Sequence, residues 1–220
     1  MKPWLLLDTA WTPGNTELSL WERDTEVVIR ADGRDLMSNR MHGSEEVMAE
    51  FARSEAKDAR VLVGGLGMGY TLRAALEFLP PGGRVTVVEL SEAVVKWNRE
   101  RLGTLAGNPL DDPRVDLVLG DVGDVISREQ AAWDSILLDV DNGPDGFTQP
   151  GNDQLYGMAG LNRTRMSLRR RGILAVWSAY EDPRFENRMR RAGLRTRVER
   201  VRARLEKGGP RHVIYLGRWG

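Results

Sequence analysis

Three glycines in the middle of the chain have the spacing of a ligand-binding loop. Residues 64–71 read Gly-Gly-Leu-Gly-Met-Gly-Tyr-Thr and end an apolar segment. Because glycine has no Cβ, Gly65, Gly67 and Gly69 let the backbone approach a ligand closely and turn sharply into a helix. Tyr70 stands where a dinucleotide-binding loop has its third glycine. The run therefore predicts either a ligand loop or only a tight strand-to-helix turn.

Carboxylates follow the next two apolar segments. Glu89 comes 24 residues after Gly65, where a carboxylate can accept hydrogen bonds from both hydroxyls of a ribose. Its alternative role, capping the next helix, is less favoured because Ser91 can serve as the cap. Asp121 can accept a hydrogen bond from an adenine amino group or cap the helix that follows, and both roles stay open.

The fourth apolar segment ends in a denser polar cluster. Residues 138–144 read Leu-Asp-Val-Asp-Asn-Gly-Pro, with Asp139, Asp141 and Asn142 close together. Buried polar groups need partners, and a simple turn needs only one Asp or Asn. The cluster therefore predicts a functional site.

These residues all follow segments that resemble buried strands. Five segments are rich in Val, Ile and Leu and apolar on both faces, which is typical of parallel sheets covered by helices, namely 60–66, 84–90, 115–119, 135–140 and 172–178. Helical patterns run through 44–57, 70–79, 92–102, 122–130 and 154–170. Segments 197–205 and 212–219 predict a closing antiparallel hairpin. The expected fold is α/β, a doubly wound and mostly parallel Rossmann-like sheet, in which ligands bind beyond the carboxyl ends of the strands.

The first part of the chain has a different pattern. Short β-type runs at 17–20, 26–30 and 35–38 surround an Asp32-Gly33 turn and predict a short N-terminal β-hairpin. We therefore expect a small N-terminal β-hairpin region over residues 1–43 and an α/β domain over residues 44–220.

Composition excludes several kinds of chemistry. The chain has 220 residues, no cysteine and two histidines that lie far apart, His42 and His212. Disulfides, thiolate catalysis and a cysteine-ligated metal are excluded, and we expect no metal. No segment approaches the roughly 18 apolar residues of a membrane span, so we expect a soluble, cytoplasmic protein that does not contact a membrane.

Charge balances overall but not along the chain. There are 32 Lys and Arg against 32 Asp and Glu, yet residues 160–220 hold 17 basic and 5 acidic residues. Nucleic acid is therefore one alternative partner, but solvated basic helix faces explain the arginines and are favoured.

Aromatic residues give weaker indications. Trp97 and Tyr156 are candidates for lining a pocket, and Tyr70 is a candidate to lie over a bound ligand. Trp177 fits packing between sheet and helix, and His212 fits a structural role at the start of the last strand.

The strand-end residues, taken in order, resemble class I S-adenosylmethionine-dependent methyltransferases. The runs 60–73 and 84–90, with Val94-Val95 and the stretch from Asp139 to Leu155-Tyr156, are more specifically similar to the spermidine synthase family, the polyamine aminopropyltransferases. The resemblance covers roughly residues 17 to 180. It implies a nucleoside-binding transferase domain of the class I methyltransferase type and a homodimer.

The resemblance also implies roles for individual residues. The ribose would be held by Glu89 and the adenine by Asp121, with Asp139 as the catalytic carboxylate that deprotonates the attacking amine. The full set of implied donor-binding residues is Gly65, Gly67, Met68, Gly69, Glu89, Leu90, Asp121 and Val122. The implied substrate-binding residues are Glu45, Asp141, Asn142 and Tyr156.

Three positions depart from the family pattern. Met68 stands where the family has an aspartate that recognises the amine of the decarboxylated donor, Ser44-Glu45 replaces a Tyr-His or Tyr-Gln pair, and Asn142 replaces a second acidic residue. We therefore predict alkylation of an amine or similar group of a small acceptor with S-adenosylmethionine, methyl transfer being slightly favoured because of Met68. The alternative is aminopropyl transfer from decarboxylated S-adenosylmethionine to a polyamine. A nucleic-acid methyltransferase and a non-catalytic nucleoside-binding protein are the further alternatives.

Overall fold

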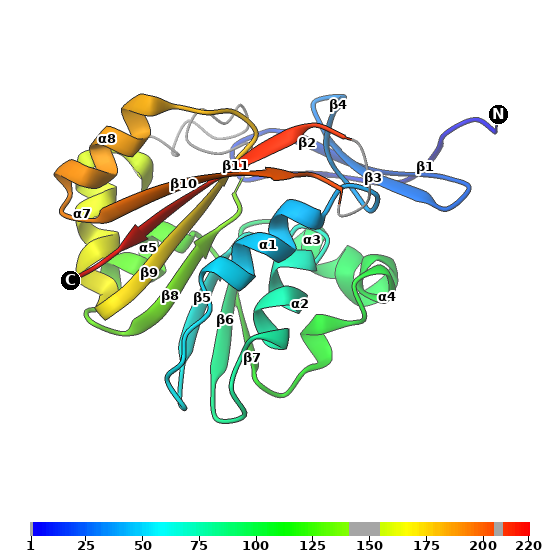
Figure 1. Cartoon of the computed structure of the whole chain (residues 1–220). Helices are drawn as coiled ribbons and strands as arrows, with labels where there is room; N and C mark the ends of the chain where they lie inside the picture. The colour runs from blue at the N-terminus through cyan, green and yellow to red at the C-terminus, as the bar shows by residue number, and fades with distance from the viewer. Residues whose placement is uncertain (1, 141–154, 205–208) are drawn as a thin grey trace.

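The computed structural model describes residues 2–140, 155–204 and 209–220, and a seven-stranded sheet forms its centre (Figure 1). The strand order is β10-β11-β9-β8-β5-β6-β7. The strands are β5 (Arg60–Gly64), β6 (Arg84–Glu89), β7 (Val115–Leu119), β8 (Trp133–Leu138), β9 (Leu168–Ser178), β10 (Arg195–Arg202) and β11 (Arg211–Arg218). Strands β5 to β9 pair in parallel, whereas β10 and β11 pair antiparallel. The predicted α/β fold with a mostly parallel sheet and a closing hairpin is confirmed.

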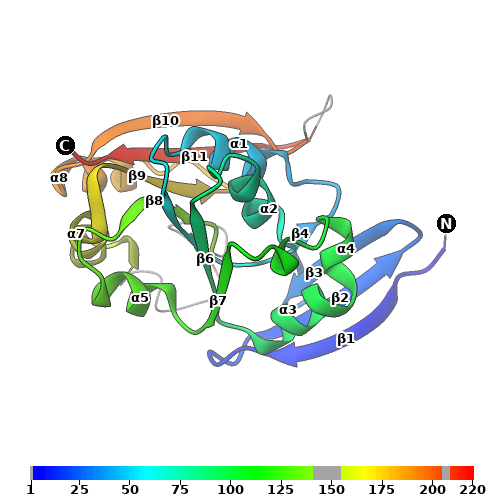
Figure 2. The same cartoon turned by 90° about the horizontal axis from the view of Figure 1, so that it is seen from below.

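Helices cover both faces of this sheet (Figure 2). The α-helices are α1 (Gly43–Phe51), α2 (Tyr70–Glu77), α3 (Glu92–Trp97), α4 (Gly103–Leu105), α5 (Val122–Arg128), α7 (Met158–Ser167) and α8 (Pro183–Arg191). One apolar core lies between the sheet and α1, α2 and α3, and the second lies between the sheet and α5, α7 and α8. Alternate residues of β9 enter the two cores, as expected for a strand buried on both faces.

Two predicted helices differ from the observed ones. Strand β9 begins at Leu168, inside the helix predicted over 154–170. Leu168 pairs with Trp133 of β8, and a register shift follows before the rest of the two strands pair from Ser135 and Ile173 onward. The helix predicted over 92–102 changes at Asn98 into a π-helix (Asn98–Leu102), which continues into α4; a 3₁₀ turn (Pro109–Asp111) follows.

A separate antiparallel sheet lies beside α3 and α4, with strands β1 (Leu5–Trp11), β2 (Glu17–Arg23), β3 (Glu26–Ala31) and β4 (Arg34–Ser38) in that order. Strand β1 is not among the predicted elements. Its attachment is visible in Asp8, whose Oδ2 accepts hydrogen bonds from Trp97 Nε1 at 2.8 Å and Lys96 Nζ at 3.2 Å. Trp97 is thus a buried anchor for β1, and it is not in the described lining of the two cavities beside the strand ends.

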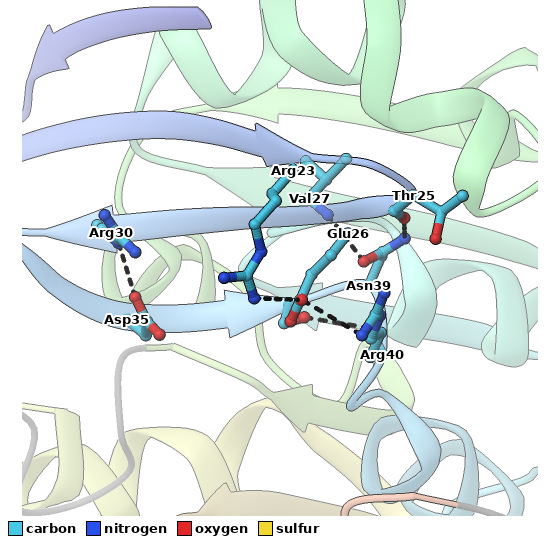
Figure 3. A network of polar contacts seen from close by, with 9 residues as sticks. Arg23, Thr25, Glu26, Val27, Arg30, Asp35, Asn39 and Arg40 are labelled. Carbon is cyan, nitrogen blue, oxygen red and sulfur yellow. Dashed lines mark hydrogen bonds and ion pairs between the residues drawn. The ribbon is translucent and has the colours of Figure 1, made fainter. Parts of the chain in front are cut away.

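Polar contacts fix the end of β4 to the start of β3 (Figure 3). Asn39 accepts a hydrogen bond from Val27 N and donates one to Thr25 O, each at 2.9 Å. Glu26 lies 3.3 Å from both Arg23 and Arg40. These contacts hold the segment that leads into α1, and with it the strand that faces the site.

None of the helices in the described ranges has the length and apolar character that a membrane span requires.

Candidate active site

The glycine loop that follows β5 is tightly enclosed. Gly65 has φ +89°, and a Cβ there would lie 2.2 Å from the carbonyl oxygen of Asp139. Gly67 has φ +53°, and its Cβ would lie 3.0 Å from the Sδ and Cε atoms of Met37 on β4. Positive φ and close contact both favour glycine, so the loop brings together β5, the end of β8 and the small sheet.

Glu89 ends β6 beside this loop. Its Oε2 accepts a hydrogen bond from Leu66 N at 2.9 Å, and its Oε1 accepts one from Ser91 N at 2.8 Å. Burial raises its pKa, and the backbone N–H groups oppose that rise. Ser91 caps α3 by accepting from Val94 N, so Glu89 is not needed as the cap. The remaining lone pairs of Glu89 can accept hydrogen bonds from a ligand.

Asp121 follows β7 at the same edge of the sheet. It is the N-cap of α5, accepting from Gly123 N at 2.7 Å, and it also lines a cavity with Glu89, Leu90 and Val122. This first cavity has a volume of about 160 Å³ and is walled by Gly65, Gly67 and residues of the small sheet.

A second cavity of about 200 Å³ meets the first. Met37, Gly67 and Asp139 line both of them. Ligands in the two cavities would therefore both lie beside Asp139.

Asp139 follows β8 directly and is held by α2. Its Oδ2 accepts a hydrogen bond from Thr71 Oγ1 at 2.7 Å. Burial raises the pKa of Asp139 to about 6, and the Thr71 hydrogen bond lowers it by a smaller amount. The carboxylate is therefore ionised at neutral pH but close to titration, as suits a general base.

Glu45 brings a second carboxyl group into the second cavity from α1. Burial, and to a smaller extent the negative charge of Asp139, together raise its pKa to about 8. At neutral pH the two carboxyl groups therefore share one proton, with Glu45 as its main site.

The remaining predicted residues lie in different places. Met68 and Tyr70 line the second cavity, away from the Glu89 end of the site, and His42 stacks on Tyr70 with ring centroids 4.0 Å apart. Gly69 caps α2 and lines neither cavity. Tyr156 also differs from expectation, because it is 1% exposed and packs edge-on against Phe185 in the core beneath α7 and α8. Asp141 and Asn142 lie outside the described residues.

Several lining residues were not predicted. Leu18, Ile29, Leu36 and Met37 reach the cavities from the small sheet. Trp177 and His212, expected to be structural, line the second cavity. Among the lining residues that were not predicted, only Thr71 could have been identified from the sequence. It directly follows the glycine loop, so the first turn of its helix lies at the strand ends.

Comparison with known proteins agrees with this architecture. The polyamine aminopropyltransferase of Korarchaeum cryptofilum is 32% identical over 81 residues, which cover 37% of this chain and 25% of that protein. Putrescine N-methyltransferase 4 of Nicotiana tabacum is 38% identical over 96 residues, which cover 41% of this chain and 24% of that protein. The match therefore spans about a quarter of the length of these relatives.

The fold match covers far more of the chain. The crystal structure of spermidine synthase from Thermotoga maritima superposes with a TM-score of 0.75 at 18% identity, covering 98% of this chain and 73% of that one. A spermidine synthase in complex with the transition-state analogue AdoDATO gives a TM-score of 0.77, also at 18% identity, and covers 98% of this chain and 72% of that one. The family model for the spermine/spermidine synthase domain matches residues 41–190. The chain therefore belongs to the spermine/spermidine synthase family.

Proposed function

We propose that the protein transfers an aminopropyl group from decarboxylated S-adenosylmethionine to a small amine acceptor of the polyamine class. The observation that carries this proposal is the charge of the two cavities. Their described lining includes no Lys or Arg but five acidic residues, Asp35, Glu45, Glu89, Asp121 and Asp139. Glu45 is mainly protonated at neutral pH and Asp35 pairs with Arg30, so the negative charge comes from the remaining carboxylates. The decarboxylated donor is cationic at both its sulfonium and its amine, whereas S-adenosylmethionine adds a carboxylate that such a lining repels.

This conclusion departs from the slight preference for methyl transfer that Met68 suggested. The family aspartate is missing at position 68, but Glu45 supplies a carboxyl group to the same cavity from α1. Aminopropyl transfer also accords with family membership and with the aminopropyltransferase relative.

The described residues suit the donor. Glu89 is oriented by two backbone N–H groups to accept from ribose hydroxyls, and Asp121 lines the same cavity. The bound donor would supply an electrophilic carbon on its sulfonium. Asp139 would hold the acceptor nitrogen and take its proton, so that the nitrogen lone pair can form the new C–N bond while the C–S electron pair passes to sulfur.

Methyl transfer from S-adenosylmethionine to an amine is the second candidate. It is favoured by the match to putrescine N-methyltransferase and by the apolar Met68 side chain in the second cavity.

Calorimetric titration with both donors, together with product analysis using putrescine or spermidine, tests the proposal. We expect binding of the decarboxylated donor to be at least about tenfold tighter, a difference of about 1.4 kcal/mol. Asp139→Asn should abolish turnover and leave donor binding nearly unchanged, while Asp116→Asn on exposed β7 serves as the control. Tighter binding of S-adenosylmethionine with methylated product would replace the proposal with the second candidate.

A further inference from the structure

The buried hydroxyl of Ser44 joins Glu45 to His212, and both of these residues line the second cavity. Ser44 is fully buried, and its Oγ lies 2.6 Å from Glu45 Oε2, 2.8 Å from His212 Nδ1 and 3.0 Å from Trp177 Nε1. Ser44 and Glu45 belong to α1, Trp177 to β9 and His212 to β11. Three elements therefore meet at one oxygen atom.

The donor and acceptor capacities of these groups restrict their protonation. The indole of Trp177 can only donate, so it occupies one lone pair of the Ser44 hydroxyl. One lone pair and one hydrogen remain for two partners. Of Glu45 and His212, one must therefore donate to Ser44 and the other must accept from it.

Two of the arrangements that satisfy this condition differ in the position of one proton. In the first, a protonated Glu45 donates to Ser44, which donates to an unprotonated Nδ1 of His212. In the second, His212 Nδ1–H donates to Ser44, which donates to an ionised Glu45. The two differ by the transfer of one proton along two short hydrogen bonds, with no movement of heavy atoms.

Alkylation of an amine releases one such proton in each turnover. A polyamine reaches the site as an ammonium and must lose a proton before its nitrogen can attack. The C–N bond then forms, the C–S bond breaks, sulfur keeps the electron pair, and the product leaves as a substituted ammonium. One proton therefore has to leave the carboxyl groups before the next cycle.

We propose that Glu45, Ser44 and His212 form a proton relay that carries this proton from Glu45 to Nδ1 of the half-buried His212 imidazole, which then releases its Nε2 proton. The relay rests on the proposed function, because amine alkylation supplies the proton. Glu45 and His212 both line the cavity, whereas the buried Ser44 acts through them as a relay residue.

Electrostatics set the resting state of the relay. The pKa of Glu45 is about 8 and burial lowers that of His212, so at rest Glu45 is protonated and His212 is neutral. When Asp139 takes the substrate proton, its negative charge no longer raises the pKa of Glu45, which then gives up its proton more readily. The other groups facing this cluster are Glu46, which also raises the pKa of Glu45, and Arg73, His42 and Tyr70 beside Glu46.

A pH profile tests the role in turnover. His212→Gln and Ser44→Ala should lower kcat about 10- to 100-fold near pH 7.5 without changing the Kd of the donor. The defect should shrink to about threefold or less at pH 10, because much of the acceptor amine is then already neutral. His42→Gln, outside the relay, should keep the wild-type profile. A loss that stays constant from pH 7 to pH 10 would overturn the proposal, since it would indicate a structural defect.

Imidazole NMR tests the relay without relying on activity. The chain has only two histidines, so ¹⁵N spectra with His42→Gln assign both. In the wild type, His212 should change from the Nε2–H to the Nδ1–H tautomer as Glu45 ionises with rising pH, and in Glu45→Gln it should not change. A His212 that keeps one tautomer from pH 5 to pH 10 in the wild type overturns the relay. A protein that shows the switch but transfers from neither donor overturns the proposed function and leaves the hydrogen-bond relay standing.

Discussion

Met37 lies directly over Gly67, with its Sδ and Cε atoms 3.0 Å from the position that a Cβ on residue 67 would occupy. Met37 belongs to the small sheet and Gly67 to the loop after β5. Both residues line both cavities, so the contact is part of the wall that the two cavities share.

Gly67→Ala should therefore weaken donor binding by at least about tenfold, because the new methyl group displaces Met37 from the cavity wall. Gly107→Ala is the matched control. Gly107 also has a positive φ, +76°, but a Cβ there would meet nothing within 4 Å. Both variants should lose about 1–2 kcal/mol of stability from backbone strain. Equal donor affinity in the two variants would contradict a role for this contact in binding, as calorimetry can show.

Glu89→Gln should reduce donor affinity and stability together. Each carboxylate oxygen accepts from a backbone N–H, so one N–H would face the glutamine amide and lose its acceptor. We expect a stability loss of about 1–3 kcal/mol and at least about tenfold weaker donor binding. Glu92→Gln, on the exposed first turn of α3, should change neither quantity. Denaturant unfolding and calorimetry measure the two effects.

Stability should fall as the pH rises through the titration of Glu45. The pKa of this group is raised from 4.5 to about 8 in the folded protein, so its contribution is full below about pH 4.5 and is lost as the pH approaches 8. Glu45→Gln should reduce the stability difference between pH 5 and pH 9 by about 1–3 kcal/mol. Thermal unfolding between pH 5 and pH 9 measures this difference. If the stability of the two proteins changes equally with pH, the pKa of Glu45 is not raised in the folded protein.

Asp8→Ala should loosen β1 while leaving the seven-stranded sheet intact. Asp8 joins β1 to Trp97 and Lys96. We expect a loss of about 1–2 kcal/mol and faster hydrogen exchange confined to the β1 and β2 amides. Lys96→Ala keeps the Trp97 hydrogen bond and should cost less than about 0.5 kcal/mol, because the ion pair is exposed. Uniformly faster exchange in Asp8→Ala would contradict a local anchor.

The sequence was sufficient to predict the parallel strands and the residues that follow them. Segments that are apolar on both faces are typical of strands in a sheet covered by helices. The carboxyl ends of parallel strands share one edge of the sheet, so the residues at or just after these ends, Glu89, Asp121 and Asp139, were expected at that edge. Strand β1 was missed because its apolar residues do not alternate with burial. Leu5 and Leu6 are adjacent and exposed.

Contacts between distant segments could not be predicted. Ser44 and His212 are 168 residues apart, and nothing in their local sequences indicates that they meet. The positions of Tyr156 and Trp177 could not be predicted either. Periodicity in the sequence identifies an apolar face but does not say whether that face lies beside a cavity. Tyr156 lies in the core, and Trp177 lines the cavity and donates to Ser44.

The first cavity takes its acidic and glycine-rich wall from the seven-stranded sheet and its apolar wall, with Leu18, Ile29 and Met37, from the small one. Neither sheet holds a complete site, so residues of both sheets contribute to the affinity for a ligand bound there. A bound donor therefore adds contacts that are lost when either sheet separates from the other. Occupancy of the cavity should make the two sheets unfold as one cooperative unit.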